Sequence, residues 1–304
     1  MNENLPLYDF DGEFQKFALS YANAKGLRTD RDMDKLEELL PKLYLRFINK
    51  PSEALDGLAP ALYFNQFADP WVLLDWMCDY ELAGIPTPDL LTERIKKLSS
   101  DDNEEEDEGK KNGAEDALME YLERPKTPYV ARLTIVSMLI DLKSIRPLSV
   151  YIDWIKGRQG KRDDLVDMAA DALIEMGDCV TEPVLAAMEK ANSDGQATFL
   201  DILCNFYERS DAHGKTIRDT RILRWAINLF LAHSEETALF ASYLGKLGDP
   251  SAIPVLLDAI RTRSLNYLDF IEARNAVEAL GGDAPEEPSW DGDPFYESLK
   301  SIRM

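Results

Sequence analysis

The chain has 304 residues, of which 45% are apolar, and a formal net charge of −22. This length accommodates two ordinary domains or one extended repeat array, and the apolar fraction excludes a wholly disordered chain. The negative charge argues against binding nucleic acid or anionic lipid, since both require clustered Lys and Arg. Two interpretations of the charge stay open: it keeps the chain soluble, or it attracts a basic partner.

Neither a membrane span nor a secretory signal is expected. No run of 18 or more apolar residues occurs, and the first residues lack a basic segment followed by an apolar one. The predicted location is therefore cytoplasmic. The three cysteines, Cys78, Cys179 and Cys204, are far apart, which fits reduced thiols. His213 and His233 are the only histidines, so neither a zinc site nor a catalytic histidine is expected.

Residues 1–98 predict an irregular helical region, because apolar residues recur with a period near 3.6 and alternating strand-like runs are missing. The predicted helices cover 9–25, 30–48, 52–67, 71–82 and 88–98. Gly26 suits the end of the first helix, and Pro41 must kink or split the second. Two interpretations of the region stay open, divergent helical pairs or a separate cap.

Residues 99–113 form the predicted division of the chain. Seven of the eight positions from Asp101 to Glu108 are acidic, and like charges at helical spacing repel one another. The segment is therefore predicted to be a solvated loop or linker. A docking strip for a basic peptide is the alternative.

From residue 114 to 284 the pattern predicts an array of paired helices. Apolar periodicity marks helices near 118–122, 130–142, 147–156, 163–176, 182–190, 197–207, 221–231, 236–247, 252–261 and 270–280. The second helices of the pairs open at Pro147, Pro183 and Pro254, where proline costs no hydrogen bond. Residues 285–304 are predicted to form an irregular tail that caps the open end of the array.

Part of this array occurs twice, in segments that start at Ala170 and Ala241, 71 residues apart, with a third echo about 36 residues after Leu244. The matched pairs are Ala170/Ala241, Leu173/Leu244, Gly177/Gly248, Asp178/Asp249, Pro183/Pro254, Val184/Val255 and Leu185/Leu256. The glycines are expected to form left-handed turns at helix ends, and the aspartates to accept backbone N–H groups that start the next helix. Such a spacing is typical of a helical solenoid.

The segment Leu244-Gly-Lys-Leu-Gly-Asp-Pro-Ser-Ala-Ile-Pro-Val-Leu-Leu-Asp-Ala-Ile resembles a HEAT repeat, of the short type found in bacterial HEAT-like and phycobilisome-lyase-like proteins. The resemblance covers roughly residues 128–281. It implies an all-α fold, built as a right-handed α–α superhelix of helical pairs. It further implies a curved array that binds proteins or peptides, with the second helices lining the concave side, but no particular function.

The predicted contact surface follows from aligning the second helices of the pairs. Residues off the buried Val-Leu stripe would face the concave side, and Tyr, Trp and Arg frequently anchor interfaces. The candidate partner-binding residues are Tyr151, Trp154, Lys190, Trp225, Asn228, Asp258 and Arg261. The alternative is that both tryptophans fill gaps in the core.

The sequence contains neither a Gly-x-Ser-x-Gly nor a His-Glu-x-x-His motif. Gly245-Lys246 lies at a helix end without the Ser or Thr of a phosphate loop. The expected function is a non-catalytic scaffold or adaptor, with no cofactor or metal, that binds a protein or peptide; a basic partner would suit the charge. The alternative is a lyase-like factor or accessory enzyme subunit that holds a small ligand in the groove.

Overall fold

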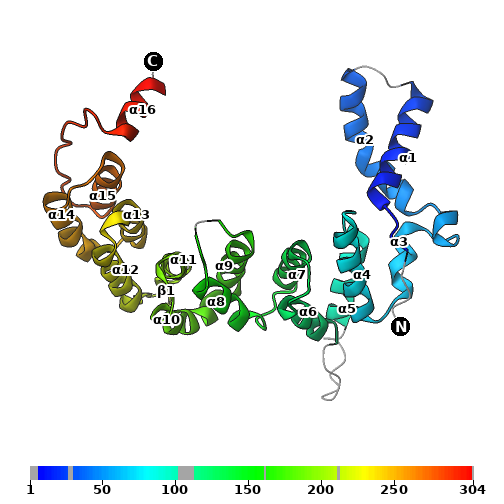
Figure 1. Cartoon of the computed structure of the whole chain (residues 1–304), viewed down its shortest axis with the longest axis horizontal. Coiled ribbons are helices and arrows are strands. Elements are labelled where there is room, and N and C mark those ends of the chain that lie inside the picture. Colours follow the sequence, from blue (N-terminus) through cyan, green and yellow to red (C-terminus); the bar gives the residue numbers. More distant parts are fainter. Residues whose placement is uncertain (1–5, 27–29, 102–112, 161, 211–212, 303–304) are drawn as a thin grey trace. The chain divides into compact units, whose positions relative to one another are not determined.

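The computed structural model describes residues 6–26, 30–101, 113–160, 162–210 and 213–302, and the fold is all-α, 72% helical (Figure 1). The all-α part of the predicted fold class is thus confirmed. Residue contacts divide the chain into two compact units, Met1–Pro147 and Leu148–Met304. Within the described ranges, no helix combines the length and the apolar character that crossing a bilayer requires.

The first unit is built from helices that pack on their neighbours in the chain. They are α1 (Phe10–Lys25), α2 (Asp30–Ile48), α3 (Pro60–Tyr63), α4 (Pro70–Ala83), α5 (Asp89–Asp101), α6 (Gly113–Glu123) and α7 (Tyr129–Asp141), with 3₁₀ turns η1 (Glu53–Leu55) and η2 (Phe64–Gln66). All five predicted N-terminal segments are helical, although 52–67 is broken into short pieces. Gly26 ends α1 with a φ of 70°, as predicted, and α2 continues through Pro41 without splitting.

An aromatic cluster fills part of the core of this unit. Trp76 on α4 lies 5.7 Å, 5.1 Å and 5.0 Å, between ring centroids, from Tyr63, Phe64 and Phe67. Trp76 and Phe64 are buried almost completely. Edge-to-face packing of this kind adds to the stabilisation that burial alone provides, so the short helices of 52–67 are held by their side chains.

The acidic segment joins two helices that belong to the same unit. Helix α5 continues to Asp101 and α6 begins at Gly113, so both ends of the predicted loop are helical; residues 102–112 lie outside the described part of the chain. Helix α4 contacts α5, α6 and α7. The helices on either side of the acidic segment therefore pack together, and the boundary between the units falls later, at Pro147.

The second unit contains α8 (Leu148–Lys156), α9 (Asp164–Met176), α10 (Thr181–Met188), α11 (Ser193–Cys204), α12 (Thr220–Ala232), α13 (Thr237–Leu247), α14 (Ile253–Thr262), α15 (Tyr267–Ala279) and α16 (Pro294–Ile302). Three 3₁₀ turns lie between these helices: η3 (Gly177–Val180), η4 (Ser234–Glu236) and η5 (Pro250–Ala252). Helices α9, α11, α13 and α15 form one row, each in contact with the next. Each of α8, α10, α12 and α14 packs on the helix that follows it in the chain.

Gly245 allows a close approach between α13 and α15. A Cβ atom on Gly245 would lie 3.3 Å from both the Cα and the Cβ of Ala276 on α15. That spacing is tighter than ordinary van der Waals contact, so any larger residue would push α13 and α15 apart. The Gly-Lys pair is thus part of a helix contact, in agreement with its predicted position at a helix end.

Three elements of the second unit were not predicted: two short strands and a C-terminal helix. Strands β1 (Glu208–Ser210) and β2 (Thr216–Arg218) pair antiparallel between α11 and α12, with Arg209 opposite Ile217. Strands of three mostly polar residues show no apolar alternation, so the sequence pattern gives no signal for them. Helix α16 replaces the end of the predicted irregular tail, and Asp293 caps it by accepting hydrogen bonds from the Phe295 and Tyr296 N–H groups, both at 3.0 Å.

The tail packs on α15, the last helix of the row. Trp290 lies 5.8 Å from the Tyr267 ring and 5.3 Å from the Phe270 ring, measured between centroids. Asp293 also accepts a hydrogen bond from the Tyr267 N–H at 3.1 Å. These contacts cover aromatic side chains at the end of the row.

Candidate functional site

Tyr151 is the predicted site residue that the structure places in the core. Its side chain is fully buried on α8, and its ring lies 5.7 Å from that of Trp154. Its hydroxyl has no hydrogen-bond partner among the described residues, and burial raises its pKa. A side chain enclosed in this way cannot contact a partner on the surface, so Tyr151 contributes to packing.

The other predicted site residues remain at least partly accessible. Trp154 and Trp225 are half-buried, on α8 and α12 respectively. Lys190, Asn228, Asp258 and Arg261 are exposed. All of them lie on or just after α8, α10, α12 and α14. None of them lines the groove that α9, α11 and α13 form.

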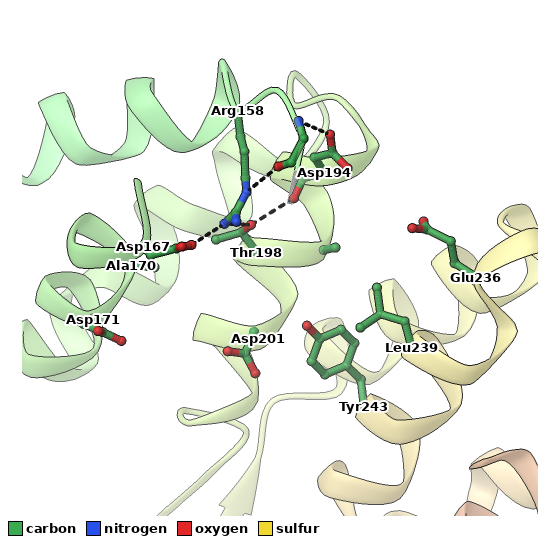
Figure 2. A pocket seen from close by; sticks show the side chains of 12 residues that line it. Arg158, Asp167, Ala170, Asp171, Asp194, Thr198, Asp201, Glu236, Leu239 and Tyr243 are labelled. Carbon is green, nitrogen blue, oxygen red and sulfur yellow. Dashed lines mark hydrogen bonds and ion pairs between the residues drawn. The ribbon is translucent and has the colours of Figure 1, made fainter. Parts of the chain in front are cut away.

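A surface groove lies on the other set of helices, α9, α11 and α13 (Figure 2). We call it the acidic groove; its volume is about 480 Å³. It is lined by Arg158, Gly160, Asp167, Ala170, Asp171, Asp194, Ala197, Thr198, Asp201, Glu236, Leu239 and Tyr243. All of these residues belong to the second unit.

Helical spacing explains why these residues share one surface. Asp167 and Asp171 are separated by one turn of α9, and Asp194, Thr198 and Asp201 follow the same stripe of α11. The small side chains between them leave space above the helices, since alanine occupies one stripe position in each. The groove is therefore a consequence of the row α9, α11, α13 and of short side chains on its exposed face.

Arg158 closes one end of the groove. Its Nη1 lies 2.9 Å from Asp167 Oδ1 and donates a hydrogen bond of 3.0 Å to Thr198 Oγ1. Its Nε donates to the Gly160 carbonyl at 3.1 Å. The side chain is only 11% exposed, so this guanidinium ties α9 to α11 and to the loop after α8. Its positive charge is paired with Asp167 inside the fold.

The carboxylates of the groove outnumber its cation. The lining contains five carboxylates and one guanidinium. Asp167 is paired with Arg158, Asp201 lies 3.0 Å from Lys246 Nζ, and Asp194 accepts a hydrogen bond from the Gly160 N–H at 2.9 Å.

Asp171 on α9 and Glu236 before α13 differ from the other three carboxylates, because within the described ranges their side chains form no ion pair and accept no hydrogen bond. Figure 2 shows them on either side of α11. The lining is thus negative, with two carboxylates available to a cation.

Tyr243 and Leu239 form the apolar wall on the α13 side. Tyr243 is half-buried, and Figure 2 shows its ring close to Asp201 with the hydroxyl end toward α11. Burial raises the pKa of Tyr243, and the negative charge of Asp201 adds to that shift. The side chain therefore stays a neutral phenol that can donate a hydrogen bond.

Cys204, close to this groove, is not activated as a nucleophile. Burial raises the pKa of the nearby Cys204 thiol to about 12, which keeps it protonated and unreactive. The arrangement is suited to binding: negative charge for a cation, an apolar wall for its hydrocarbon part and a phenol for hydrogen bonding.

The prediction of the site missed this groove because it compared only the second helices of the pairs. A signal was present in the first helices, where Asp recurs at one-turn spacing in α9 and α11. An acidic stripe usually indicates a solvated face, so the sequence alone gives no reason to prefer it.

These features define an all-α protein whose helices pack in sequential pairs. Comparison with protein-family models, characterised proteins and solved structures finds no match to this chain. The functional assignment therefore rests on the site itself.

Proposed function

We propose that this protein is a non-catalytic scaffold, built as a HEAT-like superhelical array, whose acidic groove binds a basic peptide segment of a partner protein. One observation carries the proposal: Asp171 and Glu236 line the same cavity, and neither has a cationic partner in the part of the chain that the structure describes. A Lys or Arg of the partner would supply the charge that each carboxylate lacks.

The shape and lining of the groove suit a long cationic side chain. Leu239, Tyr243 and the alanines of α9 and α11 offer an apolar surface for its methylene groups. The carboxylates offer acceptors for an ammonium or, in a two-pronged arrangement, for a guanidinium. The overall charge of −22 would also attract a basic partner from a distance and speed the association.

The proposed surface differs from the surface that the sequence predicts. The residues of the α8, α10, α12 and α14 face, including Trp154, Trp225 and Arg261, remain a competing contact surface. The two faces can be distinguished experimentally, because charge can be removed from either one without changing the other.

The proposal can be tested with peptides selected from a displayed library of random 12-residue sequences. We expect the selected sequences to be enriched in Lys and Arg. Replacing Asp171→Asn and Glu236→Gln together should weaken their binding roughly tenfold, measured by fluorescence anisotropy at physiological salt. Both changes are isosteric and remove two negative charges from the groove.

A matched control is the pair Glu189→Gln and Asp258→Asn, which removes the same charge from exposed positions outside the groove. We expect this variant to bind as wild type within a factor of about two, because exposed charges are screened by salt. Equal weakening by the two variants would show that only the total charge matters. Stronger weakening by the control would place the contact on the face that the sequence predicted.

A small organic cation is a second candidate for the groove, since cavities of this volume hold small ligands. This corresponds to the ligand-holding role that the sequence left open. A linear polyamine should then displace the selected peptides at micromolar concentration. If millimolar polyamine displaces no peptide, the groove binds a peptide and not a small cation.

A further inference from the structure

The turn between α12 and α13 gathers one histidine and two glutamates. Ligand atoms of His233, Glu235 and Glu236 all lie within 4.8 Å of one another. His233 is the C-cap of α12, and the 3₁₀ turn η4 then brings both glutamates back beside it. The backbone of the turn is fixed, because the His233 N–H donates to the Leu229 carbonyl at 2.9 Å and the Glu236 N–H to the His233 carbonyl at 3.2 Å.

The imidazole of His233 is already held in position. It stacks on the ring of Phe240, with centroids 5.4 Å apart and an interplanar angle of 28°, and Phe240 is fully buried. Its Nδ1 lies 3.4 Å from Glu235 Oε1. The donor nitrogen therefore faces the carboxylate and does not need to be ordered when a ligand arrives.

Both glutamates can supply a carboxylate oxygen. Glu235 is exposed and Glu236 is half-buried, so a bound ion could reach both carboxylates. The nearby Arg263 competes for Glu235. Its guanidinium, however, is held by hydrogen bonds of 2.9 Å to Thr237 Oγ1 and to the Phe230 carbonyl.

We propose that His233, Glu235 and Glu236 bind a divalent transition-metal ion of the zinc class, with water completing its coordination. One imidazole nitrogen and two carboxylate oxygens are donors that zinc accepts at roughly 2.0–2.2 Å. Forming these bonds requires the three donors to close from their present separation of up to 4.8 Å, through rotation of the two glutamate side chains. Calcium and magnesium are disfavoured, since both prefer oxygen ligands alone.

The inference does not depend on the acidic groove, although Glu236 also lines it. A metal ion bound there would neutralise one of the two carboxylates that we assign to the peptide. If both proposals hold, metal and basic peptide should compete.

The site can be tested by titrating the full chain with Co²⁺ and, separately, with Zn²⁺. We expect one equivalent of Co²⁺ to give a visible absorption band and Zn²⁺ to displace it, in the presence of excess Mg²⁺ that saturates the acidic surface. His233→Ala should abolish the band. Glu235→Gln should weaken binding roughly tenfold or more, and it preserves folding because the side chain is 70% exposed.

The chain supplies its own control, since His213 is the only other histidine and is exposed. His213→Ala should bind Co²⁺ as wild type. Absence of a stoichiometric band in the wild type, or a band that survives both His233→Ala and Glu235→Gln, would overturn the assignment. Thermal unfolding followed by circular dichroism shows whether each variant is folded.

Discussion

The two segments that match each other in sequence carry the same Gly-Asp pair, at Gly177-Asp178 and at Gly248-Asp249, but the two aspartates have different surroundings. Asp249 accepts hydrogen bonds from the Ser251 N–H at 2.9 Å and from the Tyr207 hydroxyl at 2.7 Å, and its side chain is 18% exposed. Asp178 caps no helix, lies 3.7 Å from Arg209 Nε and is 64% exposed. The predicted capping role is confirmed for Asp249 and is wrong for Asp178.

The difference originates in the backbone of the turn. Gly248 adopts the left-handed helical conformation, with φ 68° and ψ 19°, and Asp249 is then extended, which directs its carboxylate at the following N–H groups. Gly177 has φ 78° but ψ −156°, and Asp178 falls inside the 3₁₀ turn η3. An identical dipeptide thus supports two turn geometries, and only one of them yields a cap.

The largest effect is expected from a substitution that makes the segment from Ala241 more like the matching segment from Ala170. Gly245 corresponds to Ile174, and replacing Gly245→Ile should lower the free energy of unfolding by about 3 kcal/mol, because the new side chain would collide with Ala276. Urea denaturation measures this change. Ser242→Ile, on an exposed position of the same helix, should stay within roughly 0.5 kcal/mol. A tolerated Gly245→Ile would show that α13 and α15 can separate freely.

A smaller effect should separate the two aspartates directly. Asp249→Ala removes a helix cap and the partner of the Tyr207 hydroxyl, so we expect a loss of about 2 kcal/mol in the free energy of unfolding. Asp178→Ala should cost less than about 0.5 kcal/mol, since its longer ion pair lies in solvent. Similar losses for the two variants would contradict the structural distinction between the turns.

The architecture was largely predictable from the sequence, because apolar periodicity records the buried face of each helix. The elements that were missed leave no such record. Strands β1 and β2 are three residues each and mostly exposed, so their pairing depends on the geometry of the connection and on ion pairs such as Arg218–Glu208. Helix α16 begins with an Asp-Pro pair, a capping signal that the proline-rich surroundings obscure.

The candidate site was less predictable than the fold. Aligning the repeats identified equivalent positions, but the burial of Tyr151 depends on how neighbouring helices meet, which a single helix does not encode. At His233, the search for paired histidines and cysteines did not consider the two glutamates that follow it in the same turn. The burial of Tyr151 thus concerns contacts between elements, whereas the correct predictions concern patterns within one element.

The smallest expected effect is a pH dependence of the free energy of unfolding, which tests the hydrogen bonds that the Asp249 carboxylate accepts. Its pKa is lowered chiefly by hydrogen bonds from Ser251, with a further contribution from Tyr207. A lowered pKa in the folded state means that the ionised carboxylate stabilises the fold above its ordinary pKa of 3.8, and that this contribution is lost as the pH falls through the lower value.

We therefore expect wild type to be more stable than Asp249→Asn at neutral pH, and the gap to close on acidification below about pH 4. Urea unfolding of both proteins over this range measures it. Asp178→Asn serves as the matched control, because it changes the same residue type without removing comparable hydrogen bonds. A gap that persists in strong acid would show that the geometry of the side chain matters at Asp249 more than its charge. A gap that widens on acidification would contradict the lowered pKa itself.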